Sequence, residues 1–316
     1  MKLSKPRSAR RALIASLLCS ALLAACGGGG GGRDPILGIG GSGGSGAQGG
    51  VNAIAPVAVV PASILGSASR FGIFGGSAGM TNTGVNTVIT GSSGATANIG
   101  TTATDTTSIT GFHDSEPSDV YTETGTNVGN VTAKIYTCTT STTGPTSATV
   151  NADSCTVATT ARADVLTAYN ALVALPAGPN PGAGNLANLT LAPGTYTAAA
   201  GSFKMEGGNL TLDAQGNPNA VWVFQMATTL TVGGPGAAAP QSVVLAGGAQ
   251  ARNVYWQVGS AATINAGGGG TMVGTIISQA GTAVSTVGNA ALTTINGRVL
   301  SLGASVTVVN TAITVP

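Results

Sequence analysis

The last third of the chain, residues 219–316, consists of short apolar segments that recur with glycine-rich turns between them. Phe224-Gln225 recurs as Trp256-Gln257 after 32 residues, and Gly274 recurs as Gly297 after 23 residues. Thr-rich segments lie between the apolar ones. Self-similarity at such a period, built from strands without a helix, is typical of a β-solenoid, with loops of unequal length explaining the unequal period. This repeat restricts the fold more than any other feature of the chain.

Charged residues are scarce. They make up 7% of the sequence, against 43% hydrophobic residues and 50 glycines. A helical enzyme with so few charges would be poorly soluble, whereas a β protein covered by Thr, Ser and Asn would be solvated by hydroxyl and amide groups. The composition therefore favours a β fold with an uncharged polar surface.

The formal net charge of +2 does not describe the mature chain that we expect. Five of the twelve basic residues precede an apolar run at the N-terminus, and we expect them to be removed with it. From Gly27 onward seven basic and ten acidic residues remain, a net charge near −3. Such a chain offers no basic patch for phosphate groups, so we expect no nucleic-acid partner.

Residues 1–25 have the basic start and apolar stretch of a signal peptide. The stretch ends in Leu23-Ala24-Ala25-Cys26-Gly27, which resembles the lipobox of bacterial lipoproteins. Small residues would let the peptidase reach the backbone, and two or three acyl chains on the Cys26 thiol would anchor the protein stably in a membrane. Gly27 after the cysteine points, by this resemblance, to the outer membrane. We expect an exported, lipid-anchored protein that faces the cell surface. The alternatives are an ordinary cleaved signal with an incidental cysteine and a cytoplasmic protein in which residues 1–25 form a buried helix.

Residues 26–62 are predicted to form a tether. Six glycines open the segment, and Gly, Ser, Ala and Pro dominate the rest. Such a composition cannot bury a core and is typical of a flexible spacer. The folded domain is then expected over residues 63–316, where strand-length apolar pieces separated by glycine begin.

Residues 113–157 interrupt the repeat. Five of the ten acidic residues lie between Asp105 and Glu123, and Cys138 and Cys155 are the cysteines left once Cys19 leaves with the signal and Cys26 is lipidated. In an exported protein the default for such a pair is a disulfide, here closing a loop of roughly 17 residues and stabilising the fold by about 3 kcal/mol in the chain-entropy model. We expect this segment to cap one end of the solenoid, whose open ends need protection.

The acidic residues of the expected cap allow a second interpretation, a site for Ca²⁺ or another metal. The residues concerned are His113, Asp114, Ser115, Glu116, Asp119 and Glu123. Their spacing matches no established calcium loop, and the sequence holds a single histidine. We therefore expect a solvated acidic loop without a metal, and we expect no cofactor.

Residues 162–175 show helical periodicity. The apolar residues at helical spacing are Val165, Leu166, Tyr169, Leu172 and Val173, and Pro176 ends the segment. We expect one amphipathic helix that covers one face of the solenoid.

An ordered set of short motifs accompanies these features. The set comprises Leu65-Gly66-x-Ala68-x-x-Phe71, Ile109-Thr110-Gly111-Phe112, the helix from Ala163 to Asn170, Leu189-x-Leu191-x-Pro193-Gly194-x-Tyr196, Leu210 to Gly216, Val223-Phe224-Gln225, Gly248 to Gly259 and Asn296-Gly297-Arg298. No single motif is specific, but together, from about Ile64 to Thr314, they resemble the microbial ice-binding protein family, also known as the domain of unknown function 3494.

This resemblance implies a mostly β fold: a discontinuous right-handed β-helix of triangular section with one long α-helix packed along one face. It also implies that an N-terminal segment closes the C-terminal end of the stack, and that a cap with a disulfide in some members precedes the helix. The function that it implies is ice binding through one flat face.

Physical chemistry suggests which residues such a face would use. Strands of successive rungs lie about 4.7–4.9 Å apart, so outward side chains form a rigid array. Threonine suits it, because its hydroxyl can hold ordered water, its methyl group disfavours bulk-like hydration and its stiff χ1 costs little entropy on binding. Strand alternation places the following side chains outward: Thr229, Thr231, Thr263, Asn265, Ser285, Ser305 and Thr307. The resemblance also implies a Thr-(Ala/Gly)-x-(Thr/Asn) motif, met strictly at Thr124-Gly125-Thr126-Asn127 and closely at Thr282-Ala283-Val284-Ser285.

Two other functions remain as alternatives. A surface adhesin or structural module could use the same polar face on carbohydrate or another surface, and outward Thr, Ser and Asn could simply solvate the protein. An enzyme is not expected, because beyond the cap the acidic residues are Asp164, Glu206 and Asp213, and they show no catalytic spacing. We expect a monomer whose partners are ice and, through Cys26, a membrane.

Overall fold

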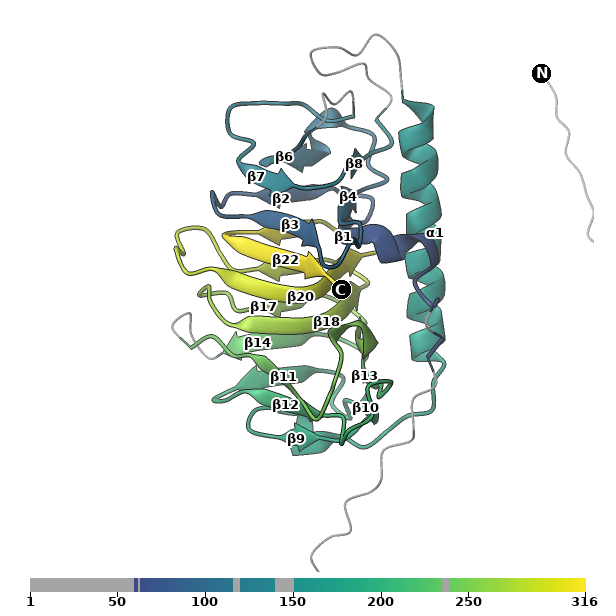
Figure 1. The fold of residues 1–316 in the computed structure, drawn as a ribbon, viewed down its shortest axis with the longest axis vertical. Coiled ribbons are helices and arrows are strands. Elements are labelled where there is room, and N and C mark those ends of the chain that lie inside the picture. The colour runs from purple at the N-terminus through teal and green to yellow at the C-terminus, as the bar shows by residue number, and fades with distance from the viewer. Residues whose placement is uncertain (1–59, 62, 116–119, 140–150, 235–238) are drawn as a thin grey trace, which may run out of the picture. The chain divides into compact units, whose positions relative to one another are not determined.

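The computed structural model describes residues 60–61, 63–115, 120–139, 151–234 and 239–316. The expected signal peptide, Cys26 and nearly all of the expected tether lie outside these ranges, so their assignment stays a prediction. Within the described residues the fold is mostly β, with parallel strands stacked in successive rungs and one α-helix alongside them (Figure 1). The expected fold class is confirmed.

The strands are short, and glycine-rich turns separate many of them. They are β1 (Phe71–Gly75), β2 (Met80–Asn82), β3 (Val88–Gly91), β4 (Asn98–Gly100), β5 (Ile109–Thr110), β6 (Phe112–Asp114), β7 (Gly129–Val131), β8 (Ile135–Tyr136), β9 (Thr190–Leu191), β10 (Gly194–Thr197), β11 (Phe203–Glu206), β12 (Leu210–Asp213), β13 (Trp222–Met226), β14 (Leu230–Gly234), β15 (Val243–Ala246), β16 (Val254–Val258), β17 (Ala262–Ile264), β18 (Thr271–Ser278), β19 (Thr282–Val284), β20 (Thr293–Ser301), β21 (Val306–Val308) and β22 (Thr311–Val315). The helices are α1 (Ala152–Val173) and the 3-10 turns η1 (Gly66–Arg70), η2 (Thr106–Ser108), η3 (Pro181–Gly184) and η4 (Ala251–Asn253).

The strands pair into three sheets. A seven-stranded sheet has the order β11-β14-β17-β19-β21-β2-β5, a three-stranded sheet the order β15-β12-β9, and a twelve-stranded sheet holds the remaining strands of the described chain. The largest sheet turns a corner because β18 and β20 are long enough to belong to two faces.

The corner in β18 and β20 lies at the recurring glycines of the sequence repeat. Gly274 and Gly297 are direct partners in the register of the two strands. Gly274 has a φ of +100°, and a Cβ on Gly297 would lie 1.9 Å from the backbone oxygen of Gly274. Only glycine permits this backbone and this approach, which explains why the residue recurs.

The N-terminal rung stacks on the C-terminal rung, so chain order and spatial order differ. β1 pairs with β20, β2 with β21 and β3 with β22, all in parallel. In Figure 1 the blue strands of the N-terminal part therefore lie directly against the yellow strands at the chain's end. The expected closure of the C-terminal end of the stack is confirmed, and β4 to β8 continue the stack beyond it.

Aromatic residues stack along the solenoid axis inside the core. Phe224 and Trp256 occupy the same register position in β13 and β16, with ring centroids 4.1 Å apart and nearly parallel planes. Tyr196 of β10 stacks on the other side of Phe224, at 5.6 Å. The alternation of inward and outward residues along each strand therefore builds a continuous apolar core.

Helix α1 covers one side of the stack but starts ten residues earlier than expected. Its buried face includes Ala158, Ala161, Val165, Ala168 and Leu172, which pack against strand residues of the twelve-stranded sheet. The expected inward positions of Leu166 and Val173 are wrong: these side chains are 42% and 51% exposed. The alanines determine the contact face, because small side chains let the helix lie close to the sheet. The early turns were missed because Ser, Cys and Thr are only moderate helix formers.

Two glutamines of the sequence repeat hold the helix in place. The Nε2 atom of Gln225 donates to the backbone oxygens of Leu172 and Leu175 at the end of α1, at 2.8 and 3.0 Å. The Nε2 atom of Gln257, one rung further, donates to the hydroxyl of Tyr169 at 2.8 Å. In each repeated pair the aromatic ring therefore packs inside the core, and the glutamine hydrogen-bonds to the helix.

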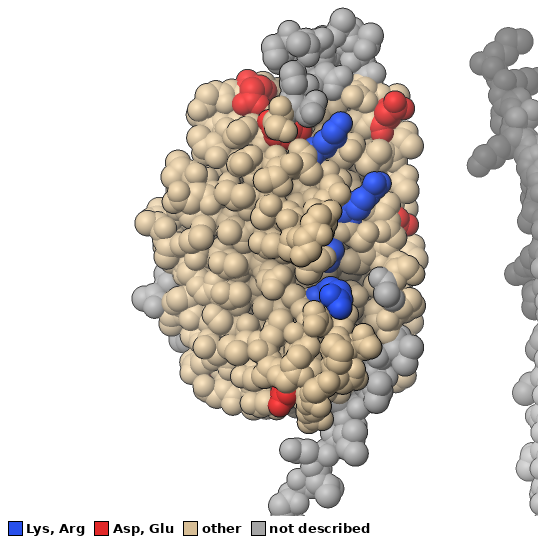
Figure 2. Space-filling view, in the orientation of Figure 1, with Lys and Arg blue, Asp and Glu red and all other residues tan. Residues whose placement is uncertain are grey.

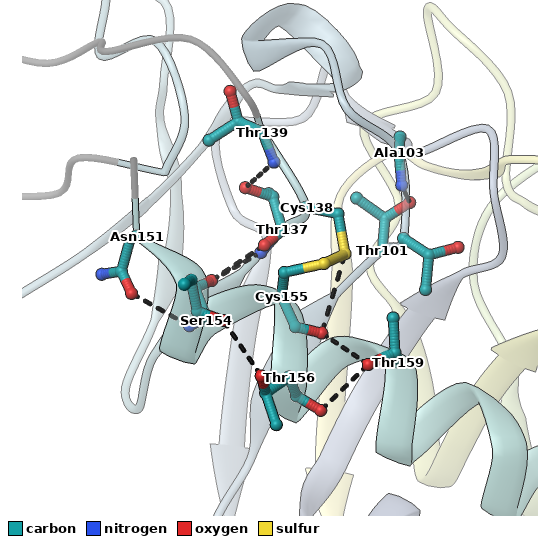
Figure 3. The surroundings of a disulfide bond; sticks show 12 residues. Thr101, Ala103, Thr137, Cys138, Thr139, Asn151, Ser154, Cys155, Thr156 and Thr159 are labelled. Atoms are coloured by element: carbon teal, nitrogen blue, oxygen red, sulfur yellow. Dashed lines mark hydrogen bonds between the residues drawn. A yellow bond between two sulfur atoms is a disulfide. The ribbon is translucent and has the colours of Figure 1, made fainter. Parts of the chain in front are cut away.

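The expected disulfide between Cys138 and Cys155 is present and joins the segment after β8 to the first turn of α1 (Figure 3). Beside it, the Thr137 backbone N–H donates to the Ser154 hydroxyl at 2.9 Å, and that hydroxyl donates back to the Thr137 oxygen at 3.0 Å. Because helix α1 begins at Ala152, the expected cap, residues 113–157, overlaps its first turns. Within the described ranges, no helix has both the length and the hydropathy needed to span a bilayer.

Candidate functional site

The seven-stranded sheet carries a column of threonines on its outer side. In its register, the central outward residue of each rung pairs with the same position in the next. From one end to the other these residues are Lys204, Thr231, Thr263, Ala283, Thr307, Thr81 and Thr110. We call the outer side of this sheet the threonine face.

The spacing of the column follows from the sheet itself. Parallel neighbours repeat at about 4.8 Å, so the backbone positions that carry these side chains stand in a row at that interval. The hydroxyls of Thr110 and Thr81 come close enough, 3.1 Å, to hydrogen-bond across two rungs. Ala283 interrupts the row between Thr263 and Thr307, which removes one hydroxyl but keeps a methyl-sized side chain.

A second set of residues flanks the column, one position before each strand. Backbone hydrogen bonds place them in successive rungs, as in the bond from the Phe203 N–H to the Thr229 oxygen at 3.2 Å. The set consists of Ser202, Thr229, Ala261, Gly281, Ser305, Gly79 and Ser108. All of these side chains are small, so the face stays flat next to the column.

Five of the seven residues predicted for the candidate face lie together on it. Thr231, Thr263 and Thr307 belong to the central column, and Thr229 and Ser305 flank it. Thr229 and Thr307 are exposed, and the other three are half-buried.

The outward orientation predicted for Asn265 and Ser285 is wrong. Their side chains are buried, at 0% and 3% exposure. Each residue follows the end of its strand with a left-handed backbone, φ +44° and +61°, so the strand alternation no longer applies. Asn265 instead links two loops: its Oδ1 accepts from the Gln241 N–H at 2.9 Å, and its Nδ2 donates to the Gln241 oxygen at 3.0 Å.

Thr81 and Thr110 belong to the face although the sequence reasoning did not select them. Met80-Thr81 and Ile109-Thr110 repeat the apolar-threonine pattern of Val306-Thr307, which was the available signal. It was overlooked because Thr81 lies some two hundred positions before Thr307, its neighbour in the column, and Thr110 in turn pairs with Thr81. The discontinuous stacking brings them there.

The two ends of the face differ. On β11, Lys204 forms an ion pair with Glu206, with 50% and 27% of the two side chains exposed. The strands β14, β17, β19, β21, β2 and β5, all fully described, contain no charged residue. At the other end of the face, the N–H of Gly111, directly after β5, donates to Asn127 Oδ1 at 3.1 Å. The strict Thr124–Asn127 motif therefore lies next to the last strand of the sheet.

Carboxylates in the described part of the chain serve structural roles. Asp164 Oδ2 accepts from the backbone N–H and the hydroxyl of Ser67, at 2.7 and 2.6 Å, and so holds η1 against α1. Asp213 accepts from the Gln215 N–H in a turn, at 2.9 Å. Burial raises the pKa of Tyr196 to about 12, so this phenol does not ionise near neutral pH. These groups do not converge on a common point as an acid–base pair would.

The residues proposed as an alternative metal site are only partly described. Glu116 and Asp119 lie outside the described residues. The Asp114 carboxylate accepts from the Ile135 N–H at 2.9 Å, which fixes β8. Among the described residues there is no group of three His, Cys, Asp or Glu side chains that could hold a metal ion.

Comparisons with known proteins give a consistent result. A family model described as ice-binding-like matches residues 74–314. An ice-binding protein of Nostoc sp. (strain HG1) is 36% identical over 205 residues, which cover 65% of this chain and 58% of that protein. Ice-binding protein 1 of Shewanella frigidimarina (strain NCIMB 400) is 42% identical over 102 residues, 30% of this chain and 10% of that protein. The chain thus matches only part of the length of these relatives.

Solved structures agree with the sequence comparison. The DUF3494 domain of the Shewanella frigidimarina protein superposes with a TM-score of 0.62 at 27% identity, covering 83% of this chain and 98% of that domain. An ice-binding protein from the Antarctic ascomycete Antarctomyces psychrotrophicus gives a TM-score of 0.57 at 30% identity, covering 80% of this chain and 97% of the other.

Proposed function

Because the chain belongs to the ice-binding-like family, we propose that it binds ice crystals through its threonine face. The observation that carries this proposal is the uncharged, in-register column of Thr231, Thr263, Thr307, Thr81 and Thr110 on one parallel sheet, interrupted once by Ala283. Relatives with the same fold are named ice-binding proteins, which supports the choice of ligand.

The chemistry of the face suits ordered water. Each threonine presents one hydroxyl, able to donate and accept, beside a methyl group. The sheet holds these groups at a repeat of about 4.8 Å, and β-branched side chains have little rotamer freedom to lose on binding. A charge would orient water around itself, and the ion pair of Lys204 and Glu206 lies at the edge of the array rather than within it.

We infer a non-catalytic role at the cell surface. The carboxylates Asp164, Glu206 and Asp213 are engaged in separate contacts, which disfavours hydrolytic chemistry. The lipobox at Cys26 and the Gly/Ser/Pro-rich residues 26–62 support a domain, residues 63–316, held on a tether at the outer membrane. We propose that this domain acts as a monomer. In that place the activity would inhibit ice recrystallisation or attach cells to ice.

The test is thermal hysteresis and ice recrystallisation inhibition by the purified chain, with albumin at the same molar concentration as reference. We expect faceted crystal growth and a measurable freezing-point gap. Behaviour indistinguishable from albumin in both assays would reject ice binding. Anchoring is tested separately: Cys26→Ser should move the protein from membranes to the medium, and wild-type protein already in the medium would contradict it.

A further inference from the structure

A groove lies on another side of the solenoid from the threonine face. It has a volume of about 810 Å³, within the range of ligand sites. Its floor comes from β18, β20 and β22, one wall from the turn after β3 and the other from η4. The lining residues used below are Thr271, Thr294, Asn296, Thr314, Arg252 and Pro316.

The floor of the groove is a ladder of uncharged polar side chains. Thr271 pairs with Thr294 and Asn296 pairs with Thr314 in the register of neighbouring rungs. The side chains of Thr294, Asn296 and Thr314 make no hydrogen bond within the described part of the chain, and all three are half-buried. Hydroxyl and amide groups that both donate and accept are the partners that sugar hydroxyls require.

Arg252 is the one charged side chain among the residues that line the groove. The Arg252 side chain is exposed and forms no ion pair with any described residue. Two further arginines lie outside the lining. The buried Arg298 donates to the Pro316 backbone oxygen at 3.2 Å and to the Ser69 oxygen at 3.0 Å, and the exposed Arg70 follows Ser69. In the view of Figure 2 the basic residues gather in one stripe, which the net charge did not predict, and acidic residues lie beside its upper end. Guanidinium groups bind carboxylates with two parallel hydrogen bonds.

We propose that this groove binds a polysaccharide that carries carboxylate groups. Arg252 takes a carboxylate, while Thr294, Asn296 and Thr314 take hydroxyls of the same chain. A linear polymer fits, because the lining residues extend over several rungs along the solenoid axis. Single-stranded nucleic acid fits poorly, since no aromatic residue is present among those that line the groove to stack on bases.

The groove and the threonine face belong to different sheets. An acidic polymer can therefore be held at the groove while the threonine face stays free. This inference does not depend on ice binding, and either function can fail without the other.

The test measures binding of a galacturonic acid oligomer to the full chain by isothermal titration calorimetry at low salt, with its methyl ester as the uncharged counterpart. We expect the acid to bind and Arg252→Ala to weaken its binding about tenfold, as loss of one charge-assisted contact would. Asn296→Ala should weaken the binding of the acid and the binding of the ester by the same factor. The matched control is Lys204→Ala, which removes a positive charge from the threonine face and should leave binding unchanged.

Thermal hysteresis of Arg252→Ala should equal that of the wild type, which separates this site from the threonine face. If Lys204→Ala loses as much affinity for the acid as Arg252→Ala does, the binding is unspecific charge attraction and the proposal is overturned. So would unchanged binding in Arg252→Ala, absence of binding by the acid, or tighter binding of a single-stranded oligonucleotide than of the acid.

Discussion

The helix-covered face and the threonine face are built on the same rungs and differ only in their outward side chains. Under the helix, one outward column reads Gln225, Gln257, Ile277, Leu300 and Phe74. On the threonine face the column reads Thr231, Thr263, Ala283, Thr307 and Thr81. The first column is buried, whereas the second is half-buried or exposed.

This difference shows how one backbone can serve two purposes. Ile277, Leu300 and Phe74 are fully buried in the cluster that includes the helix alanines, so that face is covered by the chain's own helix. Threonine, alanine and glycine on the other face bury too little apolar area to hold a helix. The face therefore stays open to solvent, and its regular spacing becomes available for a ligand.

The largest expected effect is a difference between the two faces in how much a substitution lowers the free energy of unfolding. Ile277→Ala removes a buried side chain between sheet and helix, and we expect it to lower the free energy of unfolding by about 2–5 kcal/mol. The matched change Thr263→Ala, on a half-buried residue of the open face, should stay within about 0.5 kcal/mol. Urea denaturation measures both. Equal losses of unfolding free energy in the two variants would show that the side chains of the threonine face contribute to stability as much as core side chains do.

The disulfide belongs to the helix side of the comparison. Replacing Cys138 and Cys155 together by Ala should lower the free energy of unfolding by about 3 kcal/mol, because the unfolded chain gains the freedom of the opened loop. Ice recrystallisation inhibition at low temperature should persist, since the threonine face lies elsewhere. A folded double variant without ice activity would place part of the site in the cap.

A substitution of Asn265 tests where the threonine face ends. Because its amide is buried and bonded to Gln241, Asn265→Ala should cost about 1–3 kcal/mol in unfolding free energy. Thr307→Ala, exposed in the central column, serves as control and should cost less than about 0.5 kcal/mol. If Asn265→Ala is neutral in stability and lowers ice affinity, the side chain faces outward after all.

The sequence predicts the solenoid well because its repeat reflects the backbone directly. Gly274 and Gly297 mark a corner, and the pair Phe224 and Trp256 marks one register position. The two failures in the face, Asn265 and Ser285, have a local cause: alternation holds only within a strand, and a left-handed residue after the strand reverses the side-chain direction. Sequence spacing does not reveal where that turn begins.

Long-range stacking explains the residues that were missed. Thr81 and Thr110 join the column because the N-terminal rung pairs with the C-terminal one, and nothing in the local pattern of β2 or β5 specifies that partner. For helix α1 the sequence did show the element, but it did not show which side chains face the sheet. Its buried face is set by Ala158 and Ala161, which have too little apolar area to stand out beside Leu166.

The central claim is that ice meets the threonine face. The direct measurement is ice affinity, by thermal hysteresis at matched concentrations, for Thr263→Tyr and Thr307→Tyr, with Thr190→Tyr on the three-stranded sheet as control. A ring that projects from the flat column should remove most of the activity in the first two variants, and all three should melt at the wild-type temperature. Unchanged activity in Thr263→Tyr and Thr307→Tyr, or its loss in Thr190→Tyr alone, would contradict the assignment.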